Sequence, residues 1–339
     1  MTMPDKKKKT KTKKQKHLTR KIILLAVIVV ALFVVLCFIS PKEAEMKVQT
    51  ATAGGRIENL EIPTRVEGDQ IIQHTGYTLS FNDEHKVANW VAYELTRDEV
   101  LGAGSREDSF KVDPAVKNGS ATLKDYKKSG YDRGHLAPAA DFKWSEDAMS
   151  DTFFMSNMTP QDPNFNRGIW SDLEAVVRTM AYENESVYVV TGPVLTDGPY
   201  ETIGDSKVTV PKRFYKVILD YTDPDIKAIG FVLPNEGSDQ PLQSYAMSVR
   251  DVEEITGINF FYLLPDDIEE MLETTFDTSK WSFRLFTPTG ETADVVYVAQ
   301  TQSESEKIKQ LILTALYEMK KAVFEYTGTT KIAKELGLI

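Results

Sequence analysis

Apolar and polar residues alternate in the segment 74–96, where Tyr77, Leu79 and Phe81 are each separated by one residue. The polar run NDEH interrupts this pattern, and the apolar-rich run NWVAYEL follows it. Alternation with a period of two is typical of β-strands, and two such runs around a short polar turn predict a hairpin. Short apolar runs predict further strands at residues 187–191, 214–219 and 226–233.

A helical period replaces the alternation in two segments, and one predicted helix runs from Asn166 to residue 183. We expect its apolar stripe to pack against the sheet, and this stripe consists of Ile169, Leu173, Val176 and Met180. Residues four apart form a neighbouring stripe of Asn166, Trp170, Glu174 and Arg178. A second amphipathic helix is predicted at residues 303–326, either docked on the core or free to bind a partner. Strands mixed with a few helices predict an α+β domain.

The first forty residues differ from the rest of the chain. Residues 6–21 are rich in lysine, and residues 22–40 contain no charge in nineteen positions. At 1.5 Å rise per residue, nineteen residues just span a hydrocarbon core of roughly 30 Å. The positive-inside rule then places the N-terminus in the cytoplasm and the body on the other side of the membrane. The alternative is a cleaved signal peptide with TATA at residues 50–53 as the processing site, which would yield a secreted protein.

Charge is distributed unevenly along the chain. Residues 1–40 hold ten Lys or Arg and one acid, so the body keeps 30 basic against 49 acidic residues, a net of −19. An acidic body argues against a broad polyanion-binding surface, so a nucleic-acid site would have to be a local basic cleft. The single cysteine, Cys37, excludes an internal disulfide and a cysteine-based zinc cluster.

These patterns divide the chain into five parts. They are a basic cytoplasmic tail at 1–21, a transmembrane helix at 22–40, a linker at 41–59, a folded domain at 60–285 and a C-terminal strand and helix extension at 286–339.

The segment SGYDRGHLAPAADF, residues 129–142, places Asp132, Arg133, Gly134 and His135 next to one another. An imidazole with its ordinary pKa near 6.5 can take a proton near neutral pH, and a guanidinium offers paired donors to a phosphate. A glycine lets another group approach the backbone closely. An isolated histidine is more often structural than catalytic, so the catalytic interpretation depends on a second motif.

That second motif is SNMTPQDPNFNRGIWSDLE at residues 156–174, with Arg178 four residues beyond Glu174. Acid and base at this spacing can also simply pair on the helix surface. Together with DRGH, NWVAYEL, TGPVL and VPKRFYK, the motif resembles the DNA/RNA non-specific endonuclease family over roughly residues 60–283. The resemblance implies a ββα-metal (His-Me finger) nuclease domain with a central antiparallel sheet, preceded here by the transmembrane helix.

The resemblance also implies a role for each residue of the motifs. It makes His135 the general base and Asn166 the one protein ligand of Mg²⁺, with Mn²⁺ as an alternative. Glu174 would hold metal-bound waters, and Asn157 and Gln161 would surround the base and the metal. The phosphate-binding residues would be Arg133, Arg178 and Arg106. We expect Asp132 to orient its neighbours through hydrogen bonds.

These roles predict a metal-dependent endonuclease that hydrolyses DNA and RNA with little sequence specificity, because phosphates carry no sequence information. Two alternatives remain, a phosphodiesterase for smaller substrates and an inactive membrane-anchored domain that binds nucleic acid or protein. Whether the chain forms a homodimer is left open. The residues expected to form one positive cleft are Arg133, Arg178, Lys124, Lys127, Lys128 and Lys143.

Overall fold

The structure is a computed structural model that describes residues 55–65, 68–106, 108–287 and 292–293. Contacts divide the chain into residues 1–50 and 51–339, and every described residue belongs to the second unit. The predicted transmembrane helix and the predicted C-terminal helix both lie outside the described residues. Among the residues that are described, no helix combines the length and the apolar character needed to cross a membrane.

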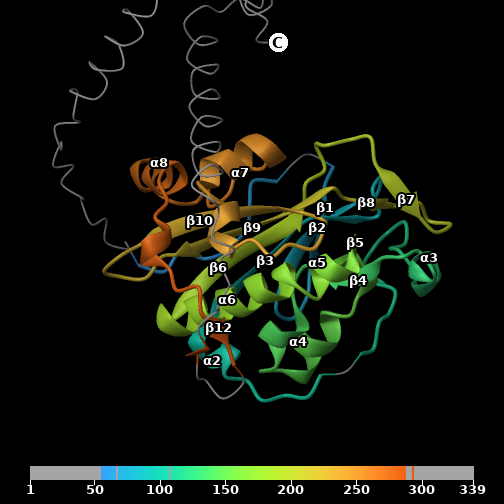
Figure 1. Cartoon of the computed structure of the whole chain (residues 1–339), viewed down its shortest axis with the longest axis horizontal. Helices are drawn as coiled ribbons and strands as arrows, with labels where there is room; N and C mark the ends of the chain where they lie inside the picture. Colours follow the sequence, from blue (N-terminus) through green and yellow to red (C-terminus); the bar gives the residue numbers. More distant parts are fainter. Residues whose placement is uncertain (1–54, 66–67, 107, 288–291, 294–339) are drawn as a thin grey trace, which may run out of the picture. The chain divides into compact units, whose positions relative to one another are not determined.

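A seven-stranded antiparallel sheet forms the centre of this unit (Figure 1). The strands lie in the order β1 (Gln70–Gln73), β2 (Thr78–Asn82), β3 (Val87–Thr96), β6 (Ser186–Pro193), β9 (Arg213–Asp220), β10 (Lys227–Pro234) and β11 (Ala246–Met247). The predicted hairpin is confirmed as β2 and β3, which pair antiparallel. The three further predicted strands are confirmed as β6, β9 and β10, each within two residues of its expected ends.

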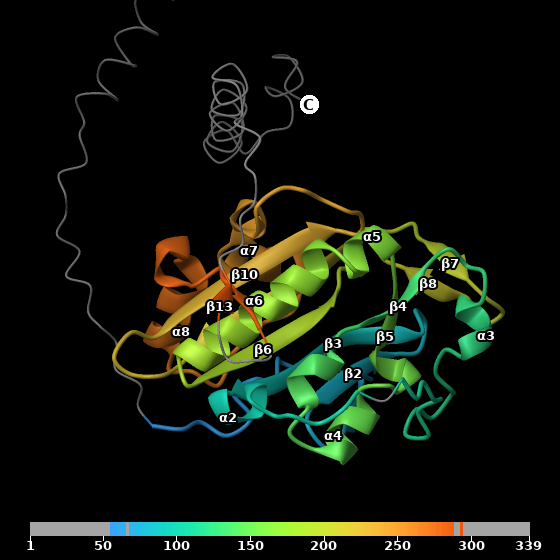
Figure 2. The same cartoon turned by 60° about the horizontal axis from the view of Figure 1, so that its bottom comes forward.

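Both faces of the sheet are buried, because successive side chains of a strand point to opposite faces. On β9, Phe214 and Ile218 belong to one core, whereas Tyr215 and Val217 belong to the other. Helix α6 (Ile169–Glu183) covers the first face, and α7 (Val249–Thr256) and α8 (Asp266–Thr274) contribute to the second core (Figure 2). The sheet therefore forms the middle of three layers.

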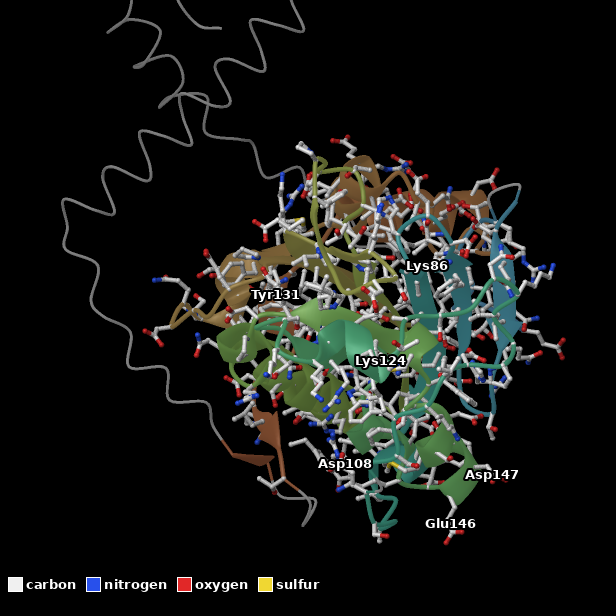
Figure 3. All side chains as sticks on the ribbon, turned by 90° about the vertical axis from the view of Figure 1, so that its right-hand side faces the viewer. Lys86, Asp108, Lys124, Tyr131, Glu146 and Asp147 are labelled. Atoms are coloured by element: carbon white, nitrogen blue, oxygen red, sulfur yellow. The ribbon has the colours of Figure 1, made fainter. Side chains whose placement is uncertain are left out.

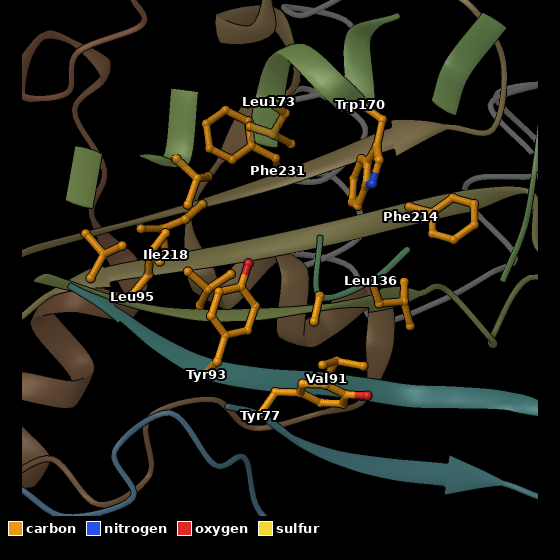
Figure 4. Packing of buried hydrophobic residues seen from close by; sticks show 14 of the residues in the cluster. Tyr77, Val91, Tyr93, Leu95, Leu136, Trp170, Leu173, Phe214, Ile218 and Phe231 are labelled. Carbon is orange, nitrogen blue, oxygen red and sulfur yellow. The ribbon is translucent and has the colours of Figure 1, made fainter. Parts of the chain in front are cut away.

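The apolar stripe of α6 is buried as predicted. Ile169, Leu173, Val176 and Met180 are each 2% exposed or less. Trp170 is also fully buried, and its ring centroid lies 5.7 Å from that of Phe214 (Figure 4). Trp170 thus belongs to the core rather than to a stacking surface.

The continuous helix predicted from Asn166 onward is wrong, because the helix is interrupted at Gly168. Asn166 ends a separate turn, α5 (Pro163–Asn166), and α6 begins at Ile169. Gly168 has φ −112° and ψ −119°, and a Cβ at this position would lie 2.4 Å from the backbone oxygen of Asn164. Only a residue without a side chain fits this close approach, and the helical period gives no sign of it.

Smaller elements surround the sheet. The two-stranded ribbons are β4 (Asp132–His135) with β5 (Met158–Gln161), β7 (Glu201–Ile203) with β8 (Val208–Val210), and β12 (Leu285–Phe286) with β13 (Thr292–Ala293). The short helices are α2 (Arg97–Val100), α3 (Leu123–Tyr126) and α4 (Glu146–Asp151), with 3₁₀ turns at Ala139–Phe142, Met155–Asn157, Leu242–Tyr245 and Thr278–Lys280. A separate apolar cluster, which includes Met158 and Val208, joins the β4–β5 ribbon to the β7–β8 ribbon.

Candidate active site

The DRGH motif forms strand β4, which pairs antiparallel with β5 of the second motif. Asp132 lies opposite Gln161, and His135 lies opposite Met158. Because α5 follows β5 directly, the two motifs meet in one ribbon and the turn of helix after it. This ribbon is separate from the seven-stranded sheet.

Gly134 is required because the side chain of Gln161 occupies the space beside it. A Cβ on Gly134 would lie 2.1 Å from Cδ of Gln161, and Gln161 is fully buried. The close approach predicted at Gly134 is therefore present, and the approaching group is a side chain of the facing strand. Neither polar atom of the Gln161 amide has a hydrogen-bond partner among the described residues.

Asn157 supports the segment that follows β4. Its Oδ1 accepts a hydrogen bond from the Ala137 amide at 2.9 Å, and its Nδ2 donates to the carbonyl oxygens of Ala137 and Thr152 at 2.9 and 2.8 Å. The side chain is fully buried. The Asn157 amide thus hydrogen-bonds to the backbone of Ala137, two residues beyond His135, and Asn157 holds this segment of the chain in place.

The ring of His135 is packed between aromatic side chains. Its centroid lies 5.8 Å from that of Phe110 and 5.1 Å from that of Phe153. Burial lowers the pKa of His135 to about 3, and the nearby charge of Arg106 lowers it further. The Nε2 atom is buried without a hydrogen-bond partner among the described residues. An imidazole in this state is neutral near pH 7 and, with its proton on Nδ1, has a free acceptor on Nε2. Its pKa is far below the ordinary value near 6.5 expected from the sequence, so the ring is available as an acceptor but is a weaker base than an ordinary imidazole.

A cavity of about 650 Å³, here called the arginine hollow, is lined in part by Phe110, whose ring packs against His135; His135 itself is not among the residues that line the hollow. Arg106, Arg133 and Asn166 also contribute to its lining. Figure 3 shows this side of the molecule and labels Asp108, another residue of the lining. Two guanidinium groups and one carboxamide therefore share a single cavity, and Phe110 connects its lining to the imidazole.

The carboxamide of Asn166 is oriented by Asp132. Asn166 Nδ2 donates to Asp132 Oδ2 at 3.0 Å, and Arg167 donates to both oxygens of the same carboxylate at 2.8 and 2.7 Å. Although burial opposes the change, hydrogen bonds from Arg167 and Asn166 lower the pKa of Asp132. Because the amide nitrogen is held by a carboxylate, the amide oxygen is left for a ligand. A single amide oxygen suits a hard cation that keeps most of its waters, as Mg²⁺ does.

Arg178 of α6 forms an ion pair with Asp141 and is not among the residues that line the arginine hollow. Its Nη1 donates to Asp141 Oδ1 at 2.8 Å, and the Tyr93 hydroxyl donates to the other carboxylate oxygen at 2.8 Å. Asp141 is fully buried, and the side chain of Arg178 is 13% exposed. The helix-surface pair considered for Arg178 and Glu174 is thus replaced by a longer-range ion pair.

Glu174 shares this buried region with a lysine that sequence reasoning missed. Burial raises the pKa of Glu174 to about 7, although Lys216 and Arg178 oppose the increase. Lys216 of β9 is fully buried, and its Nζ lies 4.7 Å from the centroid of the Trp170 ring, without a hydrogen-bond partner among the described residues. The available signal was a lysine in the middle of the apolar run FYKVIL.

The single positive cleft predicted from six basic residues forms only in part. Arg133 lines the arginine hollow together with Arg106, whereas Arg178 is paired with Asp141. Leu123, at the start of α3, also lines the hollow. Exposed lysines on α3 and just after it are Lys124 (labelled in Figure 3), Lys127 and Lys128. Lys143 is half-buried, and its carbonyl oxygen accepts a hydrogen bond from Gly104.

Comparison with known proteins agrees with this geometry. The family described as DNA/RNA non-specific endonuclease matches residues 56–267. The chain is 35% identical over 265 residues to the mitochondrial nuclease EXOG of Danio rerio, covering 74% of this chain and 75% of the relative. It is 36% identical over 205 residues to the mitochondrial endonuclease G of Homo sapiens, covering 56% and 69%. A chain in the crystal structure of the EndoG/EndoGI complex has a TM-score of 0.57 and 33% identity, covering 64% of this chain and 94% of that one.

The chain therefore belongs to the DNA/RNA non-specific endonuclease family, and it is an endonuclease that hydrolyses phosphodiester bonds. The family predicted from the two motifs is confirmed, as is the α+β fold with an antiparallel central sheet.

Proposed function

We propose that this endonuclease depends on a divalent metal and cleaves both DNA and RNA with little sequence preference, with His135 as its general base. The observation that supports this most directly is the buried, unpartnered Nε2 of His135, whose ring contacts Phe110 in the lining of a cavity that also includes Arg106, Arg133 and Asn166. Contacts of this kind address the phosphate backbone, which is common to all sequences and to both nucleic acids.

In the proposed reaction, neutral His135 accepts a proton from the water that attacks phosphorus. Arg106 and Arg133 donate hydrogen bonds to the nonbridging oxygens and balance the charge that develops there. Asn166 would hold Mg²⁺ or Mn²⁺ through its amide oxygen, and such an ion would supply Lewis-acid stabilisation of the leaving oxygen. Asp132 keeps the amide of Asn166 in the required orientation.

Glu174 would in this proposal hold waters of the ion as a carboxylate that does not itself bind the metal. Burial raises the pKa of Glu174 to about 7, and Lys216 and Arg178 offset part of that increase, so the ionised form that this role needs is gained as the pH rises through 7. A direct contact of Arg178 with phosphate stays a prediction.

The test is cleavage of supercoiled plasmid and of RNA by the full chain, with and without chelator. Chelation should abolish cleavage of both, and added Mg²⁺ should restore it. His135→Ala should lower the rate about 10²- to 10⁴-fold, the usual contribution of a general base. The matched control is His85→Ala, because the His85 ring is hydrogen-bonded to Thr209 through Nδ1 at 2.9 Å. Wild-type rates in His135→Ala would remove the general-base assignment.

We also propose that residues 22–40 anchor the chain in a membrane, with the N-terminus in the cytoplasm and the nuclease domain on the opposite side. The support is the uncharged run of nineteen residues that follows a basic segment. Membrane fractionation of the full chain, followed by protease digestion of sealed vesicles, tests both parts. Release of a shortened soluble nuclease into the medium would favour the cleaved signal peptide instead.

A further inference from the structure

The arginine hollow has an apolar wall that phosphate binding does not require. Leu123 is 46% exposed, although it is a leucine, and it lines the hollow. Phe110 lines it as well, and the Cζ of Arg133 lies 4.1 Å from the centroid of the Phe110 ring. An exposed leucine and a guanidinium stacked on an aromatic ring together suit a flat, partly apolar ligand.

A carboxylate in the same hollow points to the same kind of ligand. Asp108 lines the hollow, and its side chain is 69% exposed and bound to Arg106 Nε at 2.8 Å. A carboxylate repels a phosphate, but it accepts hydrogen bonds from the amino groups on the edge of a base. Arg106 and Arg133 supply positive charge for the phosphate attached to that base.

We infer that the arginine hollow binds one nucleobase of a single-stranded or locally unpaired nucleic acid, with the base against Leu123 and Phe110 and its phosphate toward the arginines. This inference rests on the proposed function and adds a preference for strand state. Aromatic and guanidinium surfaces stack with every base, so such a subsite keeps the enzyme indifferent to sequence. A cavity of about 650 Å³ lies within the range of sites for small ligands.

The first experiment measures binding by the full chain carrying His135→Ala, with a fluorescent single-stranded oligonucleotide as the probe. Adding Leu123→Ala should weaken binding on the order of tenfold, because an exposed contact with a base is lost. The matched control is Leu101→Ala, since Leu101 is 50% exposed and is not part of the hollow's lining. Equal affinity of the Leu123 and Leu101 variants would overturn the inference.

The second experiment separates the base from its phosphate with an oligonucleotide of the same length in which every base is missing. Protein that retains Leu123 should bind the normal strand more tightly than the abasic strand, and Leu123→Ala should narrow this difference. Phe110→Leu, which keeps an apolar residue but removes the ring, should narrow it too. If Leu123→Ala weakens the binding of the normal strand and of the abasic strand by the same factor, Leu123 does not contact a base and the inference is wrong.

Cleavage by protein with an intact His135 distinguishes the inference from the proposed function. Leu123→Ala should lower kcat/KM for single strands more than for duplex, and it should lower kcat/KM for the abasic strand less than for the normal single strand. Wild-type protein that cleaves neither DNA nor RNA would contradict the proposed function itself. Wild-type protein that cleaves both, together with a Leu123 variant that behaves identically on every substrate, would contradict the base subsite alone.

Discussion

The two faces of the central sheet are both buried, but they differ in chemistry. The face under α6 encloses Lys216, and the charged groups of Glu174 and Asp141 influence its pKa. The opposite face packs Tyr215 and Val217 of the same strand into an apolar core under α7 and α8. Buried ionic groups are weak evidence for stability because of their desolvation cost, whereas apolar burial is its main source. Both faces therefore stabilise the fold through apolar burial, and the face under α6 in addition holds buried charged groups.

The largest expected effect compares two buried phenylalanines, one for each face. Phe214→Ala and Phe260→Ala should each lower the free energy of unfolding by about 3–5 kcal/mol, measured by urea denaturation. Only Phe214→Ala should also lower the activity of the folded fraction, because the Phe214 ring stacks on Phe165 of α5, with centroids 5.4 Å apart. Equal specific activities of the two variants would show that the face under α6 does not support the active site more than the opposite face does.

Glu174→Gln is the next test, and it should separate activity from stability. Activity should fall about 10- to 100-fold, the usual effect of losing a group that orients metal-bound water. The folded pKa of Glu174, about 7, is above the unfolded value, so its stabilising contribution is complete at acid pH and is lost as pH rises through 7. The Gln variant should therefore gain stability relative to wild type between pH 5 and pH 8.

Urea midpoints at these two pH values measure the change for Glu174→Gln. Glu254→Gln on the exposed surface of α7 is the control and should change neither activity nor the midpoint difference. A Glu174→Gln midpoint that follows wild type at both pH values would mean that burial of the carboxyl group does not affect stability.

Gly134→Ala should disturb the β4–β5 ribbon through steric overlap with Gln161. Overpacking of this kind costs about 1–3 kcal/mol, and the shift of β4 should also lower the cleavage rate. The double variant Gly134→Ala, Gln161→Ala removes the overlapping side chain and should recover part of the lost stability. A single variant as stable as wild type would show that the ribbon adjusts freely.

The smallest expected effect concerns pH and His135. Its folded pKa, about 3, is below the unfolded value of about 6.5, so its contribution is complete above pH 6.5 and is lost as the pH falls. His135→Asn should therefore lose less stability than wild type when the pH is lowered from 7 to 5, as thermal unfolding at both pH values would measure. Parallel losses in the two proteins would argue against a buried neutral imidazole.

Much of the fold could be predicted because its signals are local. The alternation along β2 and β3 and the stripe on α6 each depend on neighbours in one element, and both predictions hold. The break at Gly168 was not predicted, because the apolar spacing of a helix can continue across a residue at which the helix is interrupted. The break depends instead on the close approach of Gly168 to the backbone of Asn164. Pairing of β4 with β5 apart from the main sheet is a tertiary property that no local pattern reveals.

Three of the predicted site residues share a cavity, and the roles of all the predicted site residues stay predictions. Arg106, Arg133 and Asn166 line one cavity, as their shared phosphate and metal roles would require. Arg178, however, pairs with Asp141, a residue 37 positions away in the sequence. A sequence motif indicates which side chains belong to a site. The partner of a buried charged group depends instead on how distant segments pack, which the motif does not specify.

The outer strands of the central sheet limit how folded molecules can join to one another. The sheet ends in β1, with four residues, on one side and in β11, with two residues, on the other. An edge recruits a neighbouring chain through its unpaired backbone groups, and short edges provide few of them. Association of native molecules through β1 or β11 would form only a short ladder of backbone hydrogen bonds, so a lasting oligomer built on either of these two strands would need side-chain contacts as well.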